Sequence, residues 1–186
     1  MAHPWQLRRA VQVLRGGGLI AYPTEGVYGL GCDPLDAEAV TRLLDLKGRP
    51  MAKGLILIAA ALDALEPYLL PLSEAHRAQV ERTWPGAVTW LLPARPECPA
   101  WLRGAHDTLA VRVPGHAEAR ALCAAFGGAL VSTSANRAGH RPATSPLGVR
   151  LQFGARVDYI LHAPLGGRRA PSEIRDLRTG EVLRAG

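Results

Sequence analysis

Lysine is almost missing from this chain of 186 residues: of its 22 basic residues, only Lys47 and Lys53 are lysine. Both lie in one short segment together with Arg49, directly before an apolar run. An ammonium group acts as a compact point charge, and a guanidinium group forks onto phosphate oxygens. The segment therefore indicates an anion-binding site, although a solvent-exposed basic loop would carry the same residues.

Cysteines, aromatic residues and long apolar runs are scarce as well. The three cysteines (Cys32, Cys98 and Cys123) are odd in number and widely spaced, which fits neither a disulfide framework nor a zinc site. Aromatic residues make up 5% of the chain, which argues weakly against a stacking platform for single-stranded nucleic acid. Because no apolar run approaches ~18 residues, we expect no membrane partner. The cysteine pattern favours a reducing cytoplasm as the location.

Several catalytic and nucleotide-binding motifs do not occur. There is no G-x-x-x-x-G-K-S/T loop of a P-loop NTPase, and Gly26, Gly29 and Gly31 do not form a G-x-G-x-x-G dinucleotide site. The sequence has no H-E-x-x-H motif and no Cys/His cluster, so we expect no metal held by protein residues. No serine or histidine has the setting of a catalytic triad. Catalysis would then depend on positioning and charge neutralisation, as in phosphoryl and nucleotidyl transfer.

The composition and the hydrophobic patterns indicate a globular α/β domain. Hydrophobic residues make up 48% and charged residues 20%, and the net charge of +6 indicates a polyanionic partner such as a nucleotide, RNA or DNA. Strands alternate with helices, which is typical of an α/β fold. The expected helices span residues 4–15, 36–46, 60–66, 73–83, 116–126 and 147–153. The expected strands span residues 19–22, 55–58, 88–92, 108–113, 129–132 and 158–161, with a Gly-rich loop at 23–34 and a terminal hairpin at 171–184.

Four polar segments follow apolar strands or helices, and the ends of such elements converge in α/β folds. Thr24 offers a hydroxyl to a small polar ligand or to its own turn. Lys47 and Arg49 follow a predicted helix, where cations also complement the helix dipole. Arg112 lies among apolar strand residues, and a buried arginine needs a carboxylate from the protein or from a ligand. Residues 132–136 offer hydroxyls and an amide to phosphate or ribose oxygens, or form an ordinary turn.

Taken together, these segments resemble the YrdC/TsaC family of threonylcarbamoyl-AMP synthases, in its short bacterial TsaC branch. They run in the family's order along nearly the whole chain, and the ordered set is far more specific than any one segment. The matching segments are Ala21–Glu25, Lys47–Pro50, Lys53–Ile58, Trp84–Gly86, Leu109–Val113, Ser132–Asn136, Pro171–Asp176 and Leu183–Gly186. The resemblance implies a single YrdC-like domain over residues 1–186. This domain would be a twisted mixed β-sheet flanked by helices around a basic concave cleft, without the C-terminal domain of the longer branch.

The resemblance also implies an activity. Family members form threonylcarbamoyl-AMP and pyrophosphate from L-threonine, bicarbonate and ATP, which makes them nucleotidyltransferases. Other tRNA-modification proteins then use the adenylate to modify the adenosine next to the anticodon, and direct contact with tRNA or double-stranded RNA is a further expected interaction. Mg²⁺ would arrive with ATP, since phosphate oxygens and water satisfy most of its coordination.

The site residues carried over from the family fall into two groups. The residues that would bind ATP are Lys47, Arg49, Lys53, Thr108, Ser134, Asn136 and Arg184. The residues that would bind threonine are Thr24, Arg112 and Ser132. Among them, Lys47 and Arg49 would act as catalytic residues, because the triphosphate repels the attacking carbamate unless cations mask its charge.

The sequence departs from the longer branch at two positions. Ile58 stands where that branch has a threonine-contacting histidine, so threonine recognition there must differ. Pro142 stands where that branch has a nucleotide-contacting serine, and Thr144 or Ser145 is the expected substitute. Cys32, near the expected site, is interpreted as a core residue, because the chemistry requires no thiolate.

Three other functions remain open at this point. The basic charge also suits a module that binds double-stranded RNA or tRNA without turnover, or a ribosome-assembly factor. Neither explains an arginine embedded in a strand. Similar domains form carbamoyl adenylates inside hydrogenase-maturation proteins, but in much longer, cysteine-rich chains.

Overall fold

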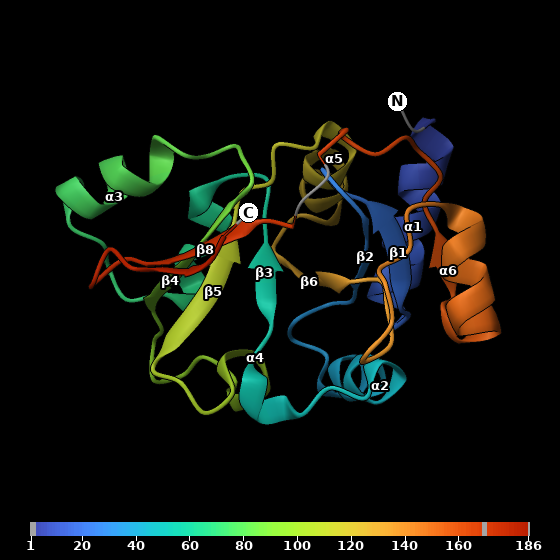
Figure 1. The fold of residues 1–186 in the computed structure, drawn as a ribbon, viewed down its shortest axis with the longest axis horizontal. Helices are drawn as coiled ribbons and strands as arrows, with labels where there is room; N and C mark the ends of the chain where they lie inside the picture. Colours follow the sequence, from blue (N-terminus) through green and yellow to red (C-terminus); the bar gives the residue numbers. More distant parts are fainter. Residues whose placement is uncertain (1–2, 169–170, 186) are drawn as a thin grey trace.

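The strands of the protein form one mixed sheet, seen in a computed structural model that describes residues 3–168 and 171–185 (Figure 1). Gly186, which ends the last family-like segment, lies outside these residues. The described strands are ordered β7-β1-β2-β6-β3-β5-β4-β8-β9. They are β1 (Ile20–Pro23), β2 (Tyr28–Gly31), β3 (Ile56–Ile58), β4 (Val88–Pro93), β5 (Thr108–Arg112), β6 (Leu130–Ser134), β7 (Tyr159–Ile160), β8 (Glu173–Asp176) and β9 (Val182–Arg184).

Helices cover both faces of the sheet. The α-helices are α1 (Pro4–Arg15), α2 (Ala37–Lys47), α3 (Glu74–Glu81), α4 (Ala100–Arg103), α5 (Ala117–Phe126) and α6 (Pro146–Phe153). Short 3₁₀ turns are η1 (Met51–Lys53), η2 (Leu62–Ala64), η3 (Glu66–Tyr68) and η4 (Gly154–Arg156). None of the helices in the described ranges is long and apolar enough to cross a membrane. The predicted class, a twisted mixed sheet flanked by helices, is confirmed.

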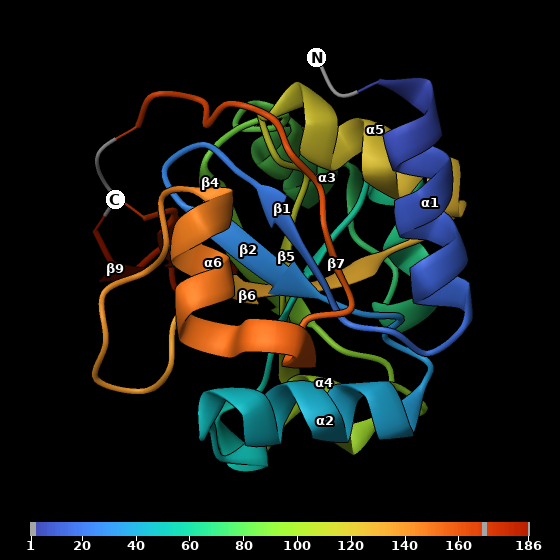
Figure 2. The same ribbon diagram turned by 90° about the vertical axis from the view of Figure 1, so that its right-hand side faces the viewer.

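The strands have two buried faces because their apolar side chains alternate between two core clusters. In β1, Ile20 and Tyr22 pack with α1 and α5, whereas Ala21 and the preceding Leu19 pack in the cluster that contains residues of α2 and α6. Figure 2 shows α1 and α5 together on one side of β1, and α2 and α6 on the other. A continuous apolar run is the pattern expected of a strand that is buried on both faces.

The pairing of the central strands determines which side chains lie next to one another in the site. Strand β3 pairs in parallel with β5 and antiparallel with β6, while β4 pairs antiparallel with β5. As a result, Ser132, Ile56, Ala110 and Leu91 stand in one row across four strands. Side chains two residues apart on a strand share a face, so this row defines one surface of the sheet.

The connection between β7 and β8 crosses the sheet. Strand β7 lies at one edge and β8 next to the other edge, so the chain between them must cross the intervening strands. Its residues 161–168, here called the strap, run over the top of the molecule in Figure 1. The strap is tied to the loop after β1 by hydrogen bonds from the Gly166 N–H to the Thr24 carbonyl (3.1 Å) and from the Arg168 N–H to the Glu25 carbonyl (2.9 Å).

The local structure differs from the expectations at four places. The helix predicted at 60–66 is replaced by η2 and η3, because Ala61, inside the predicted range, has an extended backbone (φ −150°, ψ 166°). The loop predicted at 23–34 contains β2. Gly31 stands there because a Cβ at this position would lie 2.4 Å from the Val131 carbonyl oxygen. Helix α4 was not expected, and β6 continues through Ser134 into a segment interpreted as loop.

Replacement of Leu57 tests whether β3 lies in the buried core that stabilises the fold. Its side chain is fully buried, so Leu57→Ala should lower the free energy of unfolding by about 2–5 kcal/mol through lost burial and a cavity. Urea unfolding monitored by circular dichroism measures the change. Leu151→Ala is the control, because that leucine is 78% exposed and its removal should cost no more than about 0.5 kcal/mol. Equal losses in the two variants would contradict this assignment.

Candidate functional site

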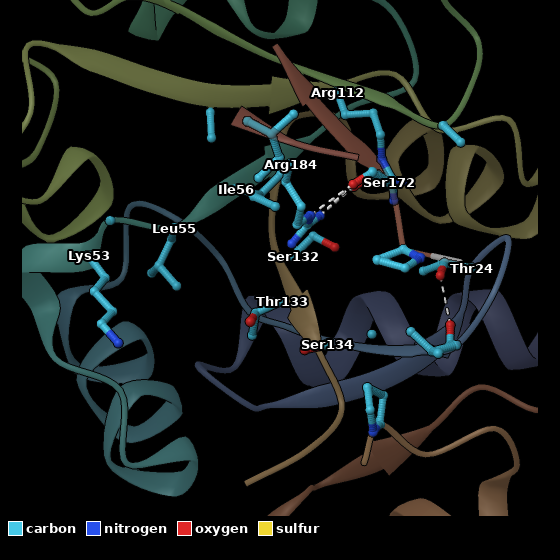
Figure 3. Close-up of a pocket in the computed structure, with 18 of the residues that line it drawn as sticks. Thr24, Lys53, Leu55, Ile56, Arg112, Ser132, Thr133, Ser134, Ser172 and Arg184 are labelled. Atoms are coloured by element: carbon cyan, nitrogen blue, oxygen red, sulfur yellow. Dashed lines mark hydrogen bonds between the residues drawn. The ribbon is translucent and has the colours of Figure 1, made fainter. Parts of the chain in front are cut away.

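A cavity of about 760 Å³ opens on the surface of the sheet defined by the Ser132 row. All four residues of that row line it, and so do Thr108 and Arg112, which share the face of Ala110 on β5. The hairpin β8–β9, the strap and the loops after β1 and α2 supply further lining residues. Figure 3 shows Lys53 on one side of this cavity, Thr24 on the other, and Arg184 and Ser132 between them.

Gly48 separates two of the predicted cations. It ends α2 in the left-handed conformation (φ 62°, ψ 39°), which glycine adopts without steric cost. The turn reverses the chain, and the Arg49 N–H donates back to the Leu44 carbonyl at 3.0 Å. Lys47 therefore stays buried under the sheet, while Arg49 reaches the cavity.

The Lys47 ammonium lies beneath the segment that follows β6 rather than in the cavity. It donates hydrogen bonds to the carbonyl oxygens of Ser134 and Asn136, the second at 2.8 Å. Burial lowers the pKa of Lys47 to about 8, and the nearby positive charge of Arg49 adds to this effect. Lys47 therefore stabilises the position of two predicted ATP-binding residues, Ser134 and Asn136, through their carbonyl oxygens. Its positive charge acts on the cavity from outside the lining.

Two arginines on opposite walls are held by main-chain oxygens. Arg49 donates to the Gly54 carbonyl through Nε (3.1 Å) and Nη2 (2.9 Å). Arg184 donates to the Ser172 carbonyl through Nε (3.0 Å) and Nη2 (2.6 Å), as the dashed lines in Figure 3 show. Burial lowers the pKa of both guanidinium groups, and the positive charges of Arg112 and Arg49 lower that of Arg184 further. The three arginines are thus electrostatic neighbours.

The three predicted threonine-binding residues come together at one end of the cavity. Arg112 ends β5, Ser132 lies in β6, and Thr24 follows β1. The Thr24 hydroxyl donates to the Val27 carbonyl at 2.7 Å, so it satisfies its own turn while its lone pairs remain able to accept. Arg112 pairs with Glu25, with 3.5 Å between Nη2 and Oε2. The expected carboxylate partner of Arg112 therefore comes from the protein itself.

The remaining predicted ATP-binding residues also line the cavity. Lys53 and Thr108 lie on its floor and wall, and Ser134 and Asn136 lie at the end of β6. The Ser134 hydroxyl donates to Asn136 Oδ1 at 2.6 Å, and Asn136 Nδ2 donates to the Arg137 and His140 carbonyls. Of the ten predicted site residues, Lys47 alone is absent from the described lining.

The charge of the cavity is strongly unbalanced. Its described lining carries one carboxylate, that of Glu25, against six side chains that are cationic at neutral pH. These are Arg49, Lys53, Arg103, Arg112, Arg168 and Arg184. Uncompensated cations in a partly desolvated cavity favour the binding of polyanions.

The positions that depart from the longer branch are now located. Ile58 is fully buried beside α5 and does not line the cavity. Pro142 does line it, whereas Ser145 caps α6 by accepting a hydrogen bond from the Gly148 N–H at 3.1 Å. The Cys32 thiol is fully buried, and burial raises its pKa to about 12, which agrees with a core role.

Sequence reasoning missed several residues of the cavity. Glu25 and Ser172 appeared only inside family-like segments, His106 was considered only as a possible triad member, and Arg103 and Arg168 were not considered. One signal could have pointed to Glu25: an embedded Arg112 demands a carboxylate, and Glu25 directly follows another predicted site residue. No comparable signal exists for Arg168, because only the path of the strap brings it to the cavity.

Residues 12–186 match the Sua5/YciO/YrdC family, which carries the description "Telomere recombination". The chain belongs to this family. It is 60% identical over 185 residues to Threonylcarbamoyl-AMP synthase of Nitrosococcus oceani, covering 99% of this chain and 100% of the relative. It is 54% identical to the protein of the same name from Halorhodospira halophila, over 97% and 95% of the two chains.

A solved structure agrees with this membership. Sua5 of P. abyssi, in a crystal structure with L-threonine, matches this Sua5/YciO/YrdC protein with a TM-score of 0.91 and 34% identity. The match covers 98% of this chain and 54% of that Sua5 chain. The present chain therefore spans about half the length of the threonine-bound protein.

The described residues do not fit a metal ion held by the protein. Among residues 3–168 and 171–185, no group of three or more His, Cys, Asp or Glu side chains could hold a metal. Glu25 accepts from the Gly115 N–H at 2.7 Å through Oε1, and its Oε2 faces Arg112, whose positive charge would repel a metal ion.

The pKa of Lys47 predicts a pH dependence of nucleotide binding. Because this pKa is lowered to about 8, the ammonium is charged below that pH and becomes neutral above it. Affinity for ATP, the ligand implied by the family resemblance, should be highest below pH 8 and fall several-fold by pH 9.5. Binding titrations across this range test the effect. Lys47→Met should bind weakly with a flatter pH profile, and an unchanged profile in that variant would assign the titration to another group.

Proposed function

We propose that this protein is an L-threonylcarbamoyladenylate synthase, which forms threonylcarbamoyl-AMP and pyrophosphate from L-threonine, bicarbonate and ATP. The observation that carries the proposal is one continuous cavity with two chemically different ends. One end offers Thr24, Arg112 and Ser132 to an amino acid, and the other offers Arg49 and Lys53 to a polyanion. The Threonylcarbamoyl-AMP synthase relatives and the threonine-bound Sua5 structure support the same assignment.

The chemistry requires two charged reactants to meet. The amine of threonine attacks bicarbonate and gives a carbamate, with loss of water. A carbamate oxygen then attacks the α-phosphorus of ATP, and pyrophosphate leaves. Arg112 would hold the threonine carboxylate, while Arg49, Lys53 and Arg184 would mask the triphosphate charge that otherwise repels the carbamate. Placing both reactants in one cavity also removes much of the entropic cost of their encounter.

The remaining assignments follow from this reaction. Transfer of an adenylyl group makes the protein a nucleotidyltransferase, with Mg²⁺ arriving on ATP rather than on a protein site. The product is a reactive mixed anhydride, so we propose that tRNA-modification proteins accept it and transfer its threonylcarbamoyl group to tRNA. A module that only binds RNA would not need the Glu25–Arg112 end of the cavity.

Pyrophosphate release tests the reaction directly. With ATP and Mg²⁺ present, release should require both bicarbonate and L-threonine, and serine or alanine should support it less well. Release that ignores bicarbonate, or no release from a folded sample that still binds RNA, would overturn the synthase and favour a binding module. Lys47→Ala separates the two further, because it should abolish turnover and leave RNA affinity unchanged.

Substitution of Arg112 tests the amino-acid end. Arg112→Gln removes the charge that would hold the threonine carboxylate, so the KM for threonine should rise about tenfold or more while the KM for ATP changes little. Steady-state kinetics with each substrate varied in turn measure both constants. Arg8→Gln, on the exposed side of α1, is the matched control and should behave as wild type. A rise in the KM for ATP alone would place Arg112 at the nucleotide instead.

A further inference from the structure

The cavity faces a problem of selectivity, because its arginines attract the same chemical groups. A guanidinium forks equally well onto a carboxylate and onto a phosphate. Arg112 and Arg49 are both close enough to Arg184 for their charges to lower its pKa. A triphosphate could therefore spread onto Arg112 and block the amino-acid end, unless something distinguishes this arginine from the others.

Glu25 is the feature that distinguishes Arg112. The two side chains are nearly buried, at 12% and 9% exposed, and they form an ion pair of 3.5 Å. No other carboxylate belongs to the cavity lining in the part of the chain that the structure describes. The Arg112 end therefore carries less net positive charge than the Arg49 and Lys53 end, where no carboxylate stands against the cations.

The ion pair neutralises Arg112 without using up its hydrogen-bond donors. A charge-assisted hydrogen bond usually measures about 2.7–2.9 Å, shorter than the 3.5 Å found here. Arg112 Nε is buried without a hydrogen-bond partner among the described residues, and so is Glu25 Oε2. Arg112 can thus still offer N–H groups to a ligand carboxylate while Glu25 reduces the net charge that the ligand meets.

Glu25 is held next to Arg112 by contacts with two segments, the turn between β5 and α5 and the strap. Its Oε1 accepts from the Gly115 N–H at 2.7 Å, at the turn between β5 and α5. Its carbonyl oxygen accepts from the Arg168 N–H of the strap at 2.9 Å. The strap also packs directly on it, since a Cβ at Gly166 would lie 2.9 Å from the Glu25 Cα. The negative charge is therefore a fixed part of the cavity.

We propose that Glu25 determines the specificity of the Arg112 end: its charge admits a zwitterionic amino acid and rejects phosphates and other anions that lack an amine. An amino acid brings one charge of each sign, so four charges alternate when it joins Glu25 and Arg112. A phosphate would meet the Glu25 carboxylate with no cation of its own, and this repulsion supplies the selectivity. The inference rests on the proposed function only in taking an amino acid as the occupant.

Binding measurements without turnover test the proposal. The probes are L-threonine, 3-hydroxybutyrate (which keeps the carboxylate and hydroxyl of threonine but lacks the amine) and inorganic pyrophosphate, each titrated by calorimetry. In Glu25→Gln, the affinity ratio should shift about tenfold or more from threonine toward 3-hydroxybutyrate, and pyrophosphate should displace threonine. Glu25→Asp keeps the charge and should keep the wild-type preference, as should the control Glu97→Gln in an exposed loop.

Two results would overturn the proposal. If Glu25→Gln weakens threonine and 3-hydroxybutyrate equally, the residue supports the fold and does not select ligands. If that variant does not fold, the competition is measured on the wild-type protein instead. Saturating pyrophosphate should leave the affinity of the wild type for threonine unchanged within about twofold. Displacement of threonine by pyrophosphate would exclude the proposed role. Failure of the synthase assignment is a separate result, since it would appear as absent pyrophosphate release while the shift in ligand preference persists.

Discussion

Positive charge gathered around one cavity, with too little negative charge to balance it, is the constraint on which the rest of this structure depends. The cations are held mainly by main-chain oxygens: Arg49 by Gly54, Arg184 by Ser172, and Lys47 by the residues after β6. A carbonyl dipole satisfies an N–H group and fixes its direction, but it leaves the full charge in place. Carboxylate partners would have stabilised the empty protein better and would have removed its attraction for polyanions.

Arg112 is the exception, because its partner is a carboxylate, that of Glu25. This ion pair makes the two ends of the cavity differ in net charge. Because one end is more strongly positive than the other, two reactants of different charge can bind side by side without exchanging places. The sheet makes this arrangement rigid: Arg112 ends β5 directly beside β3, and the Ser132 row crosses four hydrogen-bonded strands. A reaction between a carbamate and a phosphate gains most from such fixed placement, since both groups are anionic and would otherwise remain apart.

The sequence predicted which residues belong to the site better than it predicted the groups with which they interact. An arginine among apolar strand residues requires a carboxylate, and this requirement was correct, but only the sheet order brings Glu25 to Arg112. Lys47 and Arg49 were taken as a pair, and the left-handed turn at Gly48 sends them to different places. Local errors have local causes. The extended backbone of Ala61 interrupts the expected helix, and the glycines of β2, which look like a loop, permit close packing against the neighbouring strand.

The C-terminal hairpin supplies part of the site, and its exposure to solvent has a physical consequence. Hairpin β8–β9 brings Ser172 and Arg184 to the cavity, yet all three residues of β9 are exposed, whereas β5 is almost entirely buried. Local opening costs least where few apolar contacts are lost, so this wall opens more readily than the sheet beneath it. An anion bound across Arg184, Arg49 and Lys53 would join the wall to the opposite side of the cavity. Binding of such an anion should therefore stabilise this wall against local opening, through the charge that the fold leaves unbalanced.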